Sequence, residues 1–140
     1  MLPKVAFAVL IGMLPVLSAP PLDRPMQVTR VVSLSYPWLA LTAAVQGKVR
    51  LAAVIAPDGT VGSVRVLAGS VLLAPTAGQA LRKWRFVPCT TASKKCETTI
   101  MFSFVIGDDT CGLSGCQSEF WFNMPNTAVI KSNRPPPMID

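Results

Sequence analysis

The chain has 140 residues, of which 51% are hydrophobic and 14% are charged, and its formal net charge is +6. This length allows one small domain with flanking segments. The positive residues are spread along the chain, which argues against a nucleic-acid binder and for at most a mildly anionic surface partner. The sequence contains no histidine, so Ser-His and Cys-His nucleophiles and histidine metal ligands are excluded. We therefore expect that the protein is not an enzyme and that it has no cofactor, no metal site and no small-molecule substrate.

The first stretch of the chain is typical of a secretory signal. Lys4 is followed by an apolar run over residues 5–17 and then by Ser18 and Ala19. A charged start, a short apolar run and small residues at the exit are the layout of a cleaved signal peptide. We expect residues 1–18 to be removed and the mature protein to be periplasmic or secreted. The alternative is an inner-membrane anchor over residues 5–17, although a spanning helix takes ~20 apolar residues.

A proline-containing lead segment follows over residues 19–34, and its second half has the β-branched character of a short strand. The predicted domain occupies residues 35–106. It opens with a short helix through Val45, because Pro37 suits a first helical turn and Ser35 suits a cap. Gly47 ends this helix.

The next segment predicts a β-hairpin. Asp58-Gly59 lies between two runs of alternating hydrophobicity, and this dipeptide favours a two-residue type I′ turn. That turn pairs Ile55 with Gly62, Ala53 with Val64 and Leu51 with Val66. The apolar face of the hairpin then collects Val49, Leu51, Ala53, Ile55, Val64 and Val66, whereas Lys48, Arg50 and Arg65 point away from it.

An amphipathic helix follows the hairpin. Apolar residues recur about every 3.6 positions and form one stripe, made of Leu73, Ala77, Ala80, Leu81 and Trp84. Pro75 suits the first turn, and Pro88 lies beyond the end. We expect this helix to pack its stripe on the hairpin.

The third predicted strand is Thr98 to Ile106. Ile100, Phe102 and Phe104 alternate with polar or smaller residues, so they point into the core. The expected fold is α+β, a small three-stranded antiparallel sheet covered by one or two helices.

Four cysteines form two close pairs in the sequence. We expect the disulfides Cys89–Cys96 and Cys111–Cys116, because local pairing closes small loops. The alternative is zinc, but only the second pair has a spacing that structural zinc sites favour. Residues 107–140 are expected to be a disulfide-containing tail with a proline-rich end. Its aromatic stretch, Ser118 to Met124, is interpreted as a strand or plug over the sheet, or else as a partner-binding patch.

A set of residues in the domain resembles the TonB C-terminal domain family over residues 36–106. The set comprises Tyr36, Pro37, Ala40, Gln46, Gly47, Val49, Asp58, Gly59, Val61, Trp84, Arg85, Phe86, Phe102 and Phe104. The resemblance implies a role in energy-coupled transport with outer-membrane receptors. It implies that the third strand lies at a sheet edge and binds an extended peptide of a TonB-dependent receptor, or of another envelope protein, by strand addition. The outward side chains of that strand are Thr99, Met101, Ser103 and Val105.

The chain departs from the pattern of a full energy transducer. Its apolar run carries no histidine, and the only proline-rich spacer is residues 19–25, which reach ~25 Å at most. We therefore expect a periplasmic binding module. The alternative is a secreted or envelope-associated structural protein whose sheet edge is capped by its own tail.

Overall fold

A computed structural model describes residue 12, residues 26–89 and residues 96–137. Apart from residue 12, the predicted signal peptide and the alternative anchor lie outside the described residues, as does the lead segment up to residue 25. Within the described ranges, no helix is long and apolar enough to cross a membrane.

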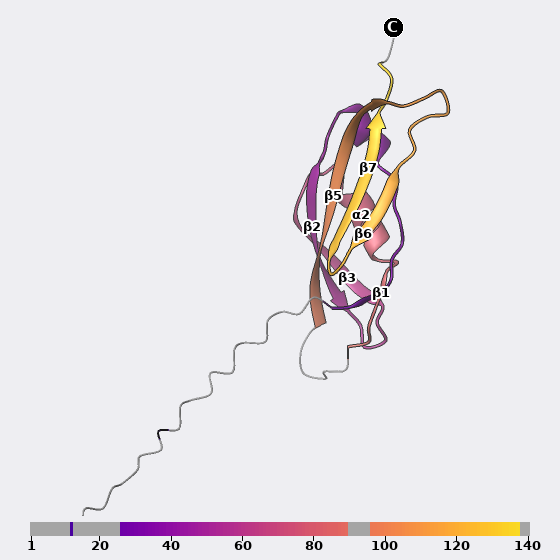
Figure 1. The fold of residues 1–140 in the computed structure, drawn as a ribbon. Coiled ribbons are helices and arrows are strands. Elements are labelled where there is room, and N and C mark those ends of the chain that lie inside the picture. Colours follow the sequence, from indigo (N-terminus) through magenta and orange to yellow (C-terminus); the bar gives the residue numbers. More distant parts are fainter. Residues whose placement is uncertain (1–11, 13–25, 90–95, 138–140) are drawn as a thin grey trace, which may run out of the picture.

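The fold is α+β, as predicted, but its sheet is larger than expected. The elements along the chain are β1 (Val28–Arg30), α1 (Trp38–Thr42), β2 (Gly47–Ile55), β3 (Val61–Ala68), α2 (Ala74–Leu81), β4 (Arg85–Phe86), β5 (Cys96–Thr110), β6 (Glu119–Asn123) and β7 (Thr127–Arg134). The main sheet has five strands in the order β3-β2-β5-β7-β6, and β1 pairs with β4 separately. Figure 1 shows α2 on one face of the sheet.

The prediction of a three-stranded antiparallel sheet is wrong, because the tail supplies two further strands, β6 and β7. After β5, the chain returns through β6, and β7 then runs between β6 and β5. Strand β7 runs antiparallel to β6 and parallel to β5. The sheet is therefore mixed, with four neighbouring pairs of which only β5–β7 is parallel.

The β2–β3 hairpin forms, but its turn differs from the prediction. Ala56 N–H donates to the Thr60 carbonyl (2.8 Å) and Gly59 N–H donates to the Ala56 carbonyl (2.9 Å). The loop therefore holds three residues, and only Gly59 has a positive φ, of 89°. A type I turn followed by a left-handed glycine is a common three-residue hairpin loop. The predicted two-residue type I′ turn is wrong.

The polar groups of the loop bind one another. Asp58 Oδ1 accepts hydrogen bonds from Thr60 Oγ1 (2.7 Å) and from Thr60 N–H (3.0 Å). These bonds favour the carboxylate and lower the pKa of Asp58. Above its ordinary pKa the carboxylate therefore stabilises the hairpin, and this stabilisation is lost as the pH falls through the lowered value.

The register beyond the loop agrees with the prediction at two pairs. Ala53 pairs with Val64, and Leu51 pairs with Val66. Ile55, however, pairs with Val61 rather than with Gly62, because the register shifts at a bulge between Val54 and Ile55. Val66 was expected in the core but is 52% exposed. It lies on the outermost strand of the sheet, where part of its side chain has no neighbour to cover it.

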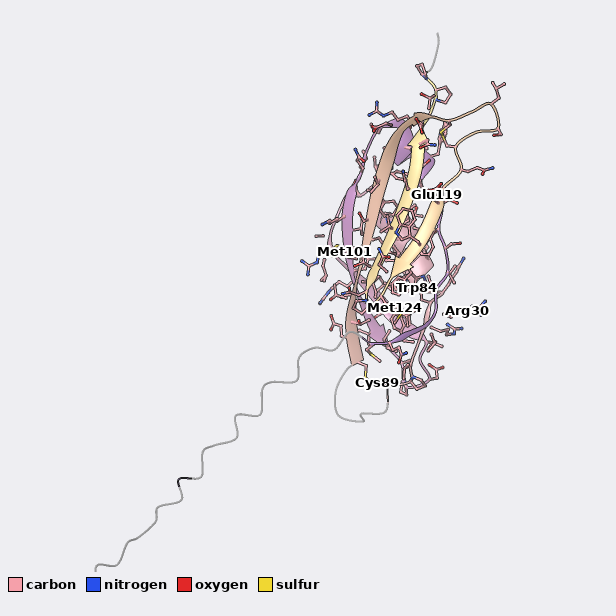
Figure 2. All side chains as sticks on the ribbon, viewed as in Figure 1. Arg30, Trp84, Cys89, Met101, Glu119 and Met124 are labelled. Atoms are coloured by element: carbon pink, nitrogen blue, oxygen red, sulfur yellow. A yellow bond between two sulfur atoms is a disulfide. The ribbon has the colours of Figure 1, made fainter. Side chains whose placement is uncertain are left out.

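The core lies between the sheet and α2. The predicted helix stripe is buried, as are the inward residues of β2 and β5. Trp84 is fully buried in this layer, and its Nε1–H donates to the Val32 carbonyl (2.9 Å) (Figure 2). The helix α1 is shorter than predicted and begins after Pro37, with no side-chain cap from Ser35.

Both expected disulfides are present. Cys89 is bonded to Cys96, and Cys111 is bonded to Cys116. The first bridge joins the segment after β4 to the start of β5. The second closes the loop between β5 and β6.

Candidate functional site

The strand expected to bind a peptide is not an edge of the sheet. It is β5, which pairs with β2 from Cys96 to Phe104 and with β7 from Met101 to Ile106. Its backbone is therefore paired on both sides from Met101 to Phe104, in the middle of the segment where the peptide was expected. The predicted edge position is wrong, because the tail supplies a strand that a sequence pattern confined to residues 35–106 does not include.

The four side chains proposed for peptide contact lie together on the open face of the sheet, which is the face away from the core and α2. Thr99, Met101 and Ser103 are half-buried there, and Val105 is exposed. They alternate with the core residues of the same strand. Because the backbone of β5 is paired on both sides from Met101 to Phe104, a partner contacts these side chains over the face of the sheet rather than by pairing with the middle of the strand.

The tail strands that close this edge are part of the core. Ala128 and Ile130 are 0% exposed, and Ser132 is also buried. The ring of Phe122 on β6 contacts the indole of Trp84, with centroids 5.3 Å apart. The aromatic stretch therefore forms a strand of the sheet, β6, beside β7, which agrees with the strand interpretation but not with a plug over the sheet. Removing β7 would expose a large part of the interior.

The two true edges of the sheet are β6 and β3. Strand β6 has five residues and begins with Glu119. Just before it, Ser118 Oγ accepts a hydrogen bond from Tyr36 N–H (2.8 Å), so the segment before α1 is attached there. Short strands and charged residues protect an edge from pairing, and β6 has both.

The edge at β3 is longer and less protected. It has eight residues, and most of them are exposed, with Val66 at 52% and Leu67 at 42%. Just before the strand begins, the backbone of Thr60 forms an isolated antiparallel β-bridge with that of Arg85. From Val61 to Ala68, no other strand of the described part of the chain pairs with its outer side. An exposed apolar edge offers unpaired N–H and C=O groups to an extended segment.

The charge at this edge is positive. Arg65 lies near the middle of β3, and its side chain is 72% exposed. Its guanidinium forms an ion pair with Glu97 (3.3 Å), and such exposed pairs contribute little to stability. The sequence pattern correctly placed Arg65 on the open face of the sheet, away from the core. It did not indicate that β3 ends the sheet, because that position follows from the pairing of β5 with β2, about which a local pattern carries no information.

One buried polar group stands out but has a structural explanation. The hydroxyl of Tyr36 donates to the Val45 carbonyl, and its ring packs edge-to-face on Phe104 with centroids 5.4 Å apart. Burial raises the pKa of Tyr36 to about 12. The group holds the segment before α1 on the core, and its raised pKa makes it a poorer base or nucleophile at neutral pH. Over the described residues, no three metal-ligating side chains lie together.

Comparison with known proteins places residues 32–106 in one family. The matching family model is described as the Gram-negative bacterial TonB protein C-terminal. A solution NMR structure of the Pseudomonas aeruginosa TonB C-terminal domain is similar, with 28% sequence identity, 58% of this chain and 86% of that chain covered, and a TM-score of 0.45. No curated protein matches the chain.

Proposed function

The chain belongs to the Gram-negative bacterial TonB C-terminal family, whose model matches residues 32–106, and from this premise we propose that it is a protein-binding module of the cell envelope. The family supports a TonB-like module in envelope transport that carries out no reaction itself. We propose that the chain is exported by its N-terminal signal. Its partner is a TonB-dependent outer-membrane receptor or another envelope protein.

The mechanism we propose is β-strand addition at the outer edge of β3. One observation carries it: within the described part of the chain, the eight residues of β3 have a strand on only one side, and they are largely exposed. An extended partner segment completes the backbone hydrogen bonds of that edge, which supplies affinity, and its alternate side chains supply selectivity. The original candidate strand, β5, is already filled by β7.

The open face of the sheet extends this proposal to folded partners. Met101 and Val105 lie on β5, two strands from the edge at β3 and therefore about 10 Å from β3. A short added strand does not reach them. A partner domain that follows the added strand can cover this face and contact Thr99, Met101, Ser103 and Val105.

The test uses peptides methylated on their backbone. The probe is a short soluble peptide in which threonine and valine alternate around one central glutamate. Two variants carry N-methyl groups on alternate amides, so each removes the donors of one side only. Strand addition predicts that one variant loses affinity at least about tenfold, whereas the other binds like the parent. Equal effects of both variants would contradict strand addition.

A second function is favoured by the closed edge of β5. The tail pairs with this strand and buries Ala128 and Ile130, as expected for an envelope-associated structural protein that caps its own sheet. In that case the chain binds no extended peptide at any edge. Calorimetric titration with the parent peptide distinguishes the two functions, because only the binding module produces a saturable heat.

A further inference from the structure

The edge at β3 carries an arginine on the open face. Arg65 pairs with Ala52 of β2 across the strand, and its guanidinium reaches Glu97 on the third strand inward. Ala52 is nearly fully buried although it lies outside the core cluster, which is consistent with cover from the Arg65 side chain. A segment added at the outer side of β3 would have one residue directly opposite Arg65.

A second arginine lies on the helix side of the same strand. A Cβ atom placed on Gly78 of α2 would be 3.8 Å from Arg82 Nη1 and 4.0 Å from Val64 Cγ1. Arg82 and Val64 therefore flank the same glycine, and the guanidinium lies near the helix-facing side of β3. Both faces of the edge thus carry positive charge.

The acidic groups nearby are already engaged. Glu97 forms its ion pair with Arg65, and Asp58 accepts two hydrogen bonds from Thr60 in the hairpin loop. Arg85 lies next to the start of β3 and adds further positive charge. Three arginines, Arg65, Arg82 and Arg85, thus stand against two carboxylates, Glu97 and Asp58, so the edge keeps a net positive charge that favours an anionic partner.

We propose, on the basis of the function proposed above, that the segment that adds to β3 is acidic at one defined position. Side chains along a strand alternate between the two faces. A residue opposite Arg65 faces the open side, and its two neighbours face the helix side, opposite Val64 and Val66. The segment is thus read as apolar, acidic, apolar.

A second copy of the chain fits this edge less well. Antiparallel pairing of two β3 strands centred on Arg65 would place two guanidinium groups directly opposite each other, which is destabilising. Charged residues in the middle of an edge strand also oppose pairing between copies. The arginine therefore selects an acidic segment over a second β3.

The experiment compares three peptides in which threonine and valine alternate around a central glutamate, glutamine or lysine. Dissociation constants are measured for the full chain at low and high salt. We expect the glutamate peptide to bind about threefold more tightly than the glutamine peptide and about tenfold more tightly than the lysine peptide. The differences should shrink at high salt.

Two variants and one control locate the effect. Arg65→Glu should reverse the order of the glutamate and lysine peptides, and Arg65→Gln should make the three peptides nearly equal. Arg50→Ala removes a charge from the same face of β2 and should preserve the order. Circular dichroism confirms that each variant is folded before binding is compared.

The outcomes separate this inference from the function on which it rests. Equal binding of the three peptides to the parent chain would overturn the acidic preference and leave strand addition intact. Failure of all three peptides to bind would overturn both. Sedimentation tests the second copy: a dimer that strengthens when the parent chain is mixed with the Arg65→Glu variant, which brings opposite charges together across the edge, would assign the edge to a second copy and overturn the inference.

Discussion

The indole ring of Trp84 packs edge-to-face against the ring of Phe122, with an angle of 85° between their planes. Trp84 lies within the segment that matches the family, residues 32–106, whereas Phe122 lies beyond it. The tail and the family domain therefore share one core. The same tail supplies β7, whose pairing with β5 places that strand, expected at an edge, in the interior of the sheet.

The first prediction concerns Trp84. Replacing a fully buried tryptophan by alanine leaves a large cavity and an unpaired Val32 carbonyl, so Trp84→Ala should lower the free energy of unfolding by about 3–5 kcal/mol. Small domains have on the order of 5–15 kcal/mol in total. Arg50→Ala, on the open face, should change it by about 0.5 kcal/mol or less. Urea unfolding measures both, and similar effects would contradict the assigned faces.

The second prediction tests whether the tail belongs to the core. Ile130 is fully buried on β7, whereas its neighbour Val129 lies on the open face and is half-buried. Ile130→Ala should destabilise the protein by about 2–5 kcal/mol, and Val129→Ala by clearly less. If both substitutions had only small effects in thermal and urea unfolding, β7 would not be packed as described.

The third prediction concerns Tyr36, the single tyrosine of the chain. Burial raises its pKa from the ordinary value of 10.0 to about 12. Between these two values the folded state holds a proton that the unfolded state has released, so stability should fall as the pH rises through this window. Absorbance of tyrosinate reads the titration directly. A midpoint near 10 in the folded protein would contradict the burial, and Tyr36→Phe should abolish the signal.

The fourth prediction concerns the hairpin loop. A Cβ atom on Gly59 would lie 2.1 Å from the Phe86 carbonyl oxygen, and this glycine has a φ of 89°. Gly59→Ala should therefore destabilise the protein by more than about 1 kcal/mol. Gly112 offers a matched control, because a Cβ atom there meets nothing within 4 Å. Equal melting temperatures for the two alanine variants would contradict the loop conformation.

Local patterns predicted the type of most elements of residues 35–106, although the helix was predicted too long. It ends at Leu81 instead of continuing through Trp84, and Arg85–Phe86 form β4. The stripe that ends at Trp84 has the helical period, and the alternation around Phe102 has the period of a strand, so each pattern directly indicated its buried side. The short spacing of each cysteine pair also predicted both disulfides. In the hairpin loop, Pro57 was the overlooked signal, because its fixed φ suits the first central position of a type I turn.

The order of the strands could not be predicted in the same way. The buried positions of β7 are Ala128, Ile130 and Ser132, and this mixture of small, apolar and polar residues gives a weak strand pattern. Its partner on β5 lies more than twenty residues earlier, and a local pattern carries no information about such pairing. The candidate site moved from β5 to β3 for this reason alone.

Hydrogen exchange at individual amides tests the central claim most directly. Exchange is followed for the full chain, alone and with the glutamate-centred peptide at saturation. Strand addition at β3 predicts slower exchange at alternate amides between Val61 and Ala68, because only those that point outward gain a partner, and unchanged exchange along β5. Slower exchange confined to Glu119–Asn123, or no change on β3 at saturating peptide, would contradict the account.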